Sequence, residues 1–322
     1  MIQDIAVSVV CNTYNHEKYI KNALEGFLMQ KTNFNYEVLI HDDASTDATA
    51  DIIREYEKKY PDIIKPIYQT ENQYSQSVRI GPNFQFPRAK GKYIAFCEGD
   101  DYWTDEHKLQ KQFDALELHP EIDICAHSSN MVEAETKNII GKIAPCNSDT
   151  IFSVEDVISG GGGFVATNSL FYRKELNDTI PKFRQYLMLD YALQIQGSLR
   201  NGMLYLKDYM SDYRYNSTNS WTSTMRTNIE KRYEHINKFI RMCEILDEET
   251  GYKYTEFITK HTLPYKTELL YIKRLKKLKF TGDDLRLFVF SISFKWKIKI
   301  LLANCLKLLR NARKFIGLIQ KK

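Results

Sequence analysis

The first 130 residues alternate short apolar runs with segments of helical spacing, and this alternation limits the possible fold more than any other feature of the sequence. The apolar runs, rich in β-branched residues, predict strands at 5–11, 36–40, 63–68 and 93–97. The segments between them predict helices at 17–30, 48–60 and 105–119. Strands that alternate with helices favour an α/β fold, in which helices flank a mostly parallel, Rossmann-like sheet.

Polar clusters follow three of these predicted strands. They are the segment NTYN at 12–15, the pair Asp42 and Asp43, and the segment EGDD at 98–101. In a sheet of this kind ligands bind beyond the carboxyl ends of the strands. Three polar strand ends therefore predict one shared site. The carboxylates of 98–101 would be costly at the end of a buried strand without a counter-charge.

Each cluster also has a purely structural interpretation. The EGDD segment could be a solvated turn in which Asp101 caps the following helix. One residue of the pair Asp42 and Asp43 could form an Asx turn before its helix. The segment NTYN, taken alone, fits a simple loop between a strand and a helix. The agreement of three clusters favours the functional interpretation over these alternatives.

Three segments carry a resemblance to a known family. VSVVCNTYNHEKYI, YEVLIHDDASTDAT and YIAFCEGDDYWTDEHKLQKQ, in this order and spacing, resemble the family-2 inverting glycosyltransferases of the GT-A fold. The resemblance covers roughly residues 4–225. It implies that a sugar is transferred from a nucleotide-sugar, with UDP the expected nucleotide, to an acceptor hydroxyl. The implied acceptor is a lipid-linked or growing glycan in the assembly of a bacterial capsule, O-antigen or exopolysaccharide.

The resemblance also assigns residues to the donor. Thr13, Tyr14 and Asn15 match the loop that holds the nucleobase. Asp42 and Asp43 match the pair at the base and ribose.

The third segment matches the metal motif of the family. Glu98-Gly99-Asp100 aligns with the family's DxD sequence, and Asp101 follows it. Glu98 and Asp100 are therefore the implied ligands of a Mn²⁺ or Mg²⁺ ion, with Glu98 in the place of the usual first Asp. Such an ion would supply the counter-charge for the carboxylates and would neutralise the departing diphosphate.

Two later segments complete the expected site. Asp190, in YLMLDYALQI, matches the position of the catalytic base, although it could also be an ordinary helix N-cap. The residues before it, 164–172, predict a further strand. In YRYNSTNSW, Arg214 could pair with phosphate or instead brace an acidic loop, and Trp221 could pack on donor or acceptor.

The charge distribution divides the chain in two. The segment 266–322 has 16 Lys and Arg against 3 Asp and Glu, whereas the whole chain has a net charge of only +4. We expect a catalytic domain at 1–225 and a helical, basic region at 226–322. The stretch FKWKIKILLANCLKLLRNARKFIGLI predicts a basic amphipathic helix on an anionic membrane surface, with packing on the body or on a second subunit as the alternative.

The remaining features bear on location and on other functions. The sequence has no run of about 18 apolar residues, so we expect no transmembrane helix. No cysteine pair has CxxC spacing, so we expect reduced thiols in a cytoplasmic protein, peripheral on the inner face of the cell membrane. The sequence has no evident base-reading module, so we expect no nucleic-acid partner.

Two other functions stay open. One is a nucleotidyltransferase, which would be expected to have a Gly-rich, basic loop after its first strand. The segment NTYN at this place is not such a loop. A catalytically degenerate transferase, used as a membrane-bound scaffold, is suggested by the glutamate at position 98.

Overall fold

The computed structural model describes residues 4–217 and 225–303. It divides the chain into two compact units, Met1–Ser223 and Thr224–Lys322. Each unit is described by itself below.

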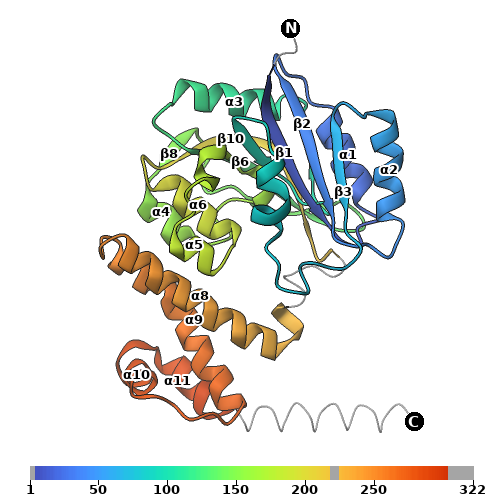
Figure 1. Ribbon diagram of the computed structural model, residues 1–322. Helices are drawn as coiled ribbons and strands as arrows, with labels where there is room; N and C mark the ends of the chain where they lie inside the picture. The colour runs from blue at the N-terminus through green and yellow to red at the C-terminus, as the bar shows by residue number, and fades with distance from the viewer. Residues whose placement is uncertain (1–3, 218–224, 304–322) are drawn as a thin grey trace, which may run out of the picture. The chain divides into compact units, whose positions relative to one another are not determined.

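The first unit contains a ten-stranded sheet (Figure 1). Its strands are β1 (Ile5–Thr13), β2 (Asn35–Asp42), β3 (Ile64–Tyr68), β4 (Tyr93–Phe96), β5 (Tyr102–Trp103), β6 (Ile124–Glu133), β7 (Ile139–Ile143), β8 (Thr150–Phe152), β9 (Phe171–Arg173) and β10 (Met203–Tyr215). The order is β3-β2-β1-β4-β9-β6-β10-β5, with β7 paired to β6 and β8 paired to β10.

The four strands predicted within the first 97 residues form one parallel part of this sheet. β1 pairs in parallel with β2 and β4, and β2 pairs in parallel with β3. β6 and β10 form another parallel pair, whereas β9, β5, β7 and β8 join in antiparallel fashion. Val7, Val9, Val10 and Cys11 of β1 are fully buried, as expected for a strand covered on both faces.

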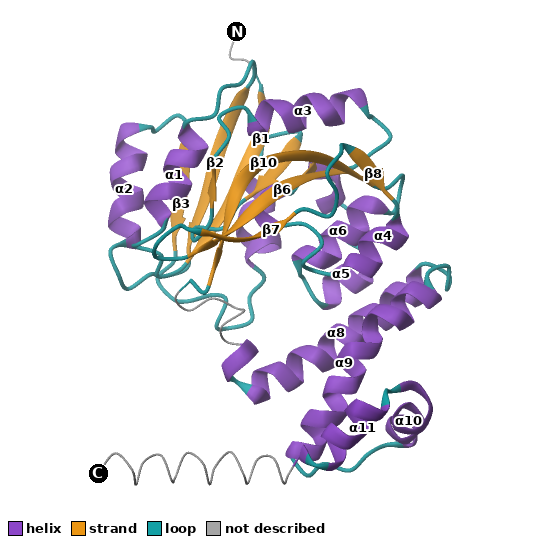
Figure 2. Cartoon of the chain, turned by 180° about the vertical axis from the view of Figure 1, so that it is seen from behind, coloured by secondary structure: helices purple, strands orange, loops and turns teal. Residues whose placement is uncertain are grey.

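Helices flank both faces of the sheet. They are α1 (Ile20–Leu28), α2 (Thr49–Lys59), α3 (Lys108–Leu118), α4 (Val154–Gly160), α5 (Lys182–Tyr186) and α6 (Asp190–Ser198). Cys125 of β6 packs in the core that contains the apolar residues of α1 and α3. Its neighbour Ile124 points the other way, toward Gly197 of α6, where a Cβ would lie 2.6 Å from that of Ile124. Figure 2 shows α4, α5 and α6 grouped together. The α/β class is confirmed.

The second unit is helical. Its elements are α8 (Ile229–Glu249), α9 (Thr255–Leu275), α10 (Gly282–Arg286), the π-helical turn η5 (Leu287–Ser291) and α11 (Phe294–Leu301). Ile236 and Ile240 of α8 pack on Leu269 and Ile272 of α9. The expected helical C-terminal region is confirmed, but its last residues, 304–322, lie outside the described part of the chain. Within residues 4–217 and 225–303, none of the helices has the length and apolar character needed to cross a bilayer.

Candidate active site

Three loops meet at the carboxyl edge of the sheet. β1, β2 and β4 are parallel neighbours, so their carboxyl ends lie side by side. Backbone hydrogen bonds continue beyond the strands: the N–H of Asp43 donates to the carbonyl of Thr13 (3.0 Å), and that of Gly99 donates to the carbonyl of Asn12 (2.9 Å). The structure therefore brings together the three polar clusters that the sequence placed at strand ends.

Gly99 allows two of these loops to touch. A Cβ at this position would lie 2.7 Å from Oγ1 of Thr13, closer than a side chain tolerates, and 3.1 Å from Nδ1 of His16. The sequence pattern assigned no role to His16. Its Nδ1 lies 3.1 Å from Oγ1 of Thr13. Burial lowers the pKa of His16, and the nearby charge of Asp100 partly opposes this effect. His16 is thus a neighbour of the acidic turn.

Asn15 and Tyr14 of the loop after β1 have different surroundings. Asn15 has a φ of 55°, and its Oδ1 accepts from the N–H of Thr46 (2.8 Å). Its own N–H donates to Oγ of Ser45 (2.9 Å). Tyr14 is exposed. Asn15 therefore fixes the shape of the loop, and the side chain of Tyr14 is accessible to a ligand.

Asp42 and Asp43 are both buried at the end of β2, where they make separate contacts. Asp42 accepts from Oγ of Ser45 (2.5 Å) and from its N–H (3.4 Å), which is an Asx-turn arrangement. Burial raises the pKa of Asp42, and the bonds from Ser45 partly offset this rise. Asp43 accepts from the N–H groups of Gln73 (2.8 Å) and Tyr74 (3.0 Å). Asp43 therefore anchors the loop that follows β3.

The acidic turn after β4 holds three carboxylates in different environments. Asp101 is buried, and its Oδ1 accepts from the backbone N–H of Arg214 (2.7 Å). Asp100 is half-buried and accepts from Oγ of Ser217 (2.7 Å). Glu98 is exposed. Burial, followed by the charge of Asp100, raises the pKa of Asp101 well above its usual range.

Glu98 and Asp190 belong to one electrostatic site, although they come from distant parts of the chain. The pKa of Glu98 is raised above its usual range. Reduced hydration is the largest cause, followed by the negative charge of Asp100 and then that of Asp190. The side chain of Glu98 is itself exposed, so water moderates this rise without reversing its direction. Glu98 is therefore repelled by two other carboxylates, and a positive charge near it would relieve this repulsion.

Arg214 supports the acidic turn. Its buried guanidinium donates to the carbonyl of Asp100 and to Oδ1 of Asn22. It also lies 4.4 Å from the ring centroid of Tyr102 and 5.0 Å from that of Tyr19. These contacts correspond to the bracing role, which was one of the two roles expected from the sequence.

Asp190 is the first residue of α6, and both of its carboxylate oxygens are engaged. Oγ1 of Thr167 donates to Oδ2 (2.5 Å), and the N–H of Tyr191 donates to Oδ1 (2.7 Å). The N-cap of the helix is Leu189, so Asp190 is not the ordinary N-cap considered above. Burial raises the pKa of Asp190, and the bond from Thr167 is the largest opposing effect.

A buried polar network holds Thr167 in place. The strand expected at 164–172 is wrong except at its last two residues: a 3₁₀ turn at Thr167–Ser169 precedes the short strand β9, which begins only at Phe171. Asn168 lies in this turn: its carbonyl accepts from Nε1 of Trp103 (3.0 Å), and its Nδ2 donates to the carbonyl of Asp212 (3.0 Å). These bonds tie the turn to β5 and β10, and Oγ1 of the preceding residue, Thr167, donates to Asp190.

Substituting Thr167 by valine is expected to change the pH dependence of activity. The hydroxyl of Thr167 favours the ionised form of Asp190, so its loss should raise the pKa of Asp190 further. The base expected from the sequence at Asp190 would have to be ionised to accept a proton. The low-pH limb of the kcat/KM profile should therefore move to higher pH, with little change on the plateau.

The matched control is Thr167→Ser, which keeps the hydroxyl and should restore the wild-type profile. Equal profiles for the valine and wild-type proteins would show that Thr167 does not affect the ionisation of Asp190.

The acidic turn suits a hard divalent cation. Glu98 and Asp100 offer the oxygen ligands that Mg²⁺ and Mn²⁺ prefer, in a site with excess negative charge. Among the residues that the structure describes, no group of three or more His, Cys, Asp or Glu side chains is arranged to hold a metal ion. One or two carboxylates would therefore bind such an ion together with ligands from another molecule, such as phosphate oxygens.

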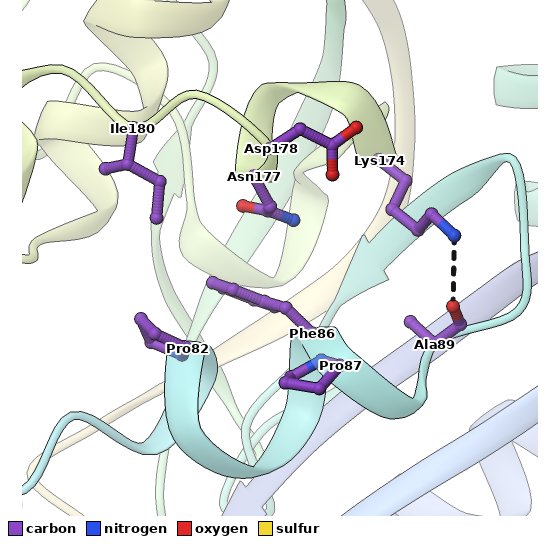
Figure 3. A pocket seen from close by; sticks show the side chains of 8 residues that line it. All are labelled: Pro82, Phe86, Pro87, Ala89, Lys174, Asn177, Asp178 and Ile180. Carbon is purple, nitrogen blue, oxygen red and sulfur yellow. Dashed lines mark hydrogen bonds between the residues drawn. The ribbon is translucent and has the colours of Figure 1, made fainter.

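Trp221 belongs to the residues 218–224, outside the described part of the chain. A cavity of about 340 Å³ is lined by Pro82, Phe86, Pro87, Ala89, Lys174, Asn177, Asp178 and Ile180. Figure 3 shows Pro82, Phe86 and Pro87 on one side of it and Asn177, Asp178 and Ile180 on the other. None of the residues predicted for the active site lines this cavity.

Comparisons with known proteins agree with this fold. Residues 8–180 match the model of glycosyl transferase family 2. The uncharacterized protein Rv1520 of Mycobacterium tuberculosis is 37% identical over 221 residues, which are 67% of this chain and 61% of that protein. The putative teichuronic acid biosynthesis glycosyltransferase TuaG of Bacillus subtilis is 38% identical over 110 residues, 34% of this chain and 41% of that protein.

Solved structures show the same architecture. The crystal structure of S. aureus TarS 1-349 in complex with UDP-GlcNAc superimposes with a TM-score of 0.55 at 17% identity, over 93% of this chain and 89% of that one. The sheet, its acidic strand end and this likeness define a GT-A fold. The chain belongs to glycosyl transferase family 2.

Proposed function

We propose that this protein transfers a sugar from a nucleotide-sugar to an acceptor hydroxyl, with a divalent metal and with inversion at the anomeric carbon. The observation that carries the proposal is the meeting of the three polar loops at the carboxyl edge of the sheet, with the charge of Asp190 acting on Glu98 of the acidic turn. In a parallel sheet this edge is where ligands bind.

The donor would be held by the loops that follow β1 and β2. Thr13, Tyr14 and Asn15 are proposed to contact the base, and Asp42 and Asp43 the base and ribose. Exposed Tyr14 offers a ring to a flat heterocycle, while Asn15 and Asp43 fix the loops around it. UDP is the first nucleotide to test, because a protein of this fold, TarS, has been crystallised with UDP-GlcNAc.

The acidic turn would hold the diphosphate end of the donor. Asp100, with Glu98, is proposed to bind Mn²⁺ or Mg²⁺, which when bound neutralises the charge that develops on the diphosphate. Arg214 and Ser217 keep Asp100 in position through its carbonyl and its carboxylate. Trp221 stays a proposed contact of donor or acceptor.

Asp190 is proposed to act as the base. As the acceptor oxygen forms its bond to the anomeric carbon, the bond to the diphosphate breaks, and the acceptor proton moves to the Asp190 carboxylate. The raised pKa of Asp190 makes it a stronger base than an ordinary aspartate, and Thr167 holds one of its oxygens. A single displacement of this kind inverts the anomeric centre.

The acceptor is proposed to be a lipid-linked or growing glycan of a bacterial surface polysaccharide. Support comes from the relatives, among them TuaG, whose name refers to teichuronic acid biosynthesis. A lipid-linked acceptor places the reaction at the cytoplasmic face of the cell membrane, where the protein is proposed to be peripheral.

The proposal is tested by calorimetric binding of UDP, GDP and dTDP to the full chain, with and without Mn²⁺. We expect UDP to bind tightly only when the metal is present. Metal-dependent binding of GDP or dTDP would keep the mechanism and change the donor. A folded protein that binds none of the three would contradict the transferase proposal and favour the scaffold.

A further inference from the structure

The second unit sorts the apolar side chains at the end of the described chain into two sets. Ile292 and Ile300 pack with Leu270 of α9 in a small core, to which Trp296 adds its ring. The other set points outward. It forms what we call the outer apolar surface: Val289, Phe290, Phe294, Ile298, Leu301 and Leu302.

Two aromatic residues of this surface are highly exposed. Phe290 is 83% exposed and Phe294 is 77% exposed. Both lie within one short stretch, on η5 and at the start of α11. Single exposed apolar residues are ordinary. Here Phe294, Ile298, Leu301 and Leu302 recur at helical spacing along α11, and the others lie on the adjoining η5, a grouping typical of an interaction site.

Contacts inside the unit fix the outward direction of these side chains. Trp296 and Ile300 hold one side of α11 against α9. Nζ of Lys297 donates to the carbonyl of Val289 (2.7 Å), which ties α11 to η5. Lys273 of α9 pairs with Asp284 of α10 (2.7 Å), which fixes the element before η5. The outer apolar surface therefore cannot turn inward without breaking the small core.

The charges around this surface favour an anionic partner. Residues 285–303 contain four basic side chains, those of Arg286, Lys295, Lys297 and Lys299, and no Asp or Glu. Arg286, Lys295 and Lys299 are exposed. Apolar side chains among cations fit the interface of an anionic bilayer, where the rings enter the acyl boundary and the cations meet the headgroups. A second copy of the same surface would bring like charges together.

We propose that the outer apolar surface docks on an anionic lipid bilayer, with Phe290 and Phe294 inserted. The sequence placed a membrane contact on the amphipathic stretch from position 294 onward, and the structure adds η5 and assigns the two phenylalanines as the inserted residues. This docking does not depend on sugar transfer and would hold for a protein without that activity.

Sedimentation of the full chain with lipid vesicles tests the proposal. We expect binding to phosphatidylcholine vesicles that contain phosphatidylglycerol, weaker binding at high salt, and little binding to phosphatidylcholine alone. The double variant Phe290→Ser/Phe294→Ser should weaken binding by at least about tenfold, because both rings lose their burial in the acyl boundary.

The matched control is Leu118→Ser/Ile139→Ser, which removes two exposed apolar residues of the first unit and should bind as the wild type does. Unchanged helical circular dichroism and unfolding temperature would show that the phenylalanine variant folds. Equal vesicle binding by that variant and the wild type would overturn the proposal. So would light scattering that shows a wild-type dimer, lost in the variant, without vesicle binding.

Discussion

Replacing Asp190 by asparagine is expected to reduce turnover by about 10²–10⁴-fold and to leave nucleotide binding unchanged. Asparagine has the same shape and can still accept from Thr167, but it cannot take the acceptor proton. Asp190 opens α6, whereas the residues proposed to hold the base and ribose follow β1 and β2. Calorimetry should therefore give a wild-type affinity for the nucleotide, while assays of nucleotide release should show the loss of rate.

Asp62→Asn is the matched control, since this exposed aspartate precedes β3 at the amino end of the parallel strands, whereas the acidic turn follows the carboxyl end of β4, and its replacement should leave the rate unchanged. If Asp190→Asn kept the wild-type rate, another group would have to remove the proton. If it abolished nucleotide binding as well, Asp190 would belong to the donor site instead.

Replacing Asp100 by asparagine is expected to remove the metal dependence of nucleotide binding and to lower turnover by about 10³-fold. A bound divalent ion contributes several kcal/mol to the stabilisation of developing charge, and each factor of ten in rate corresponds to about 1.4 kcal/mol. Asparagine can still accept from Ser217, so the loop at this point should keep its shape. Titration of Mn²⁺ in the presence of UDP measures the effect directly.

Glu98→Gln separates the two carboxylates of the proposed metal site. Glu98 is exposed, whereas Asp100 is fixed by Ser217, and Arg214 binds the carbonyl of Asp100. We therefore expect a smaller loss of Mn²⁺ affinity for Glu98→Gln than for Asp100→Asn. The reverse order would assign the metal to Glu98. Wild-type metal dependence in both variants would contradict the proposed site.

The parallel part of the fold could be predicted from the sequence because its signals are local. Apolar runs, helical spacing and polar residues at strand ends all occur within short segments. β1, β2, β3 and β4 agree with the predicted strands to within about two residues. The place of the site followed from this, because neighbouring parallel strands end at the same edge.

Other parts could not be predicted, because they depend on contacts between distant residues. The 3₁₀ turn at Thr167 replaces an expected strand, and no periodicity signals it. What fixes the turn is the hydrogen bonding of Asn168 to Trp103 and to Asp212, on two other strands. A buried amide imposes its conformation through the partners it needs, and these are set by the packing of the whole unit.

By itself, the sequence determined the α/β class, the edge at which the polar clusters meet and the acidic residues of that edge, since each is encoded in neighbouring residues. Only the tertiary structure decided the contacts that give these residues their roles. It bonded the guanidinium of Arg214 to the carbonyl of Asp100 and the hydroxyl of Thr167 to Asp190, and it left Phe290 exposed. These contacts join segments that are far apart in the chain or depend on side-chain packing, and no local pattern specifies either.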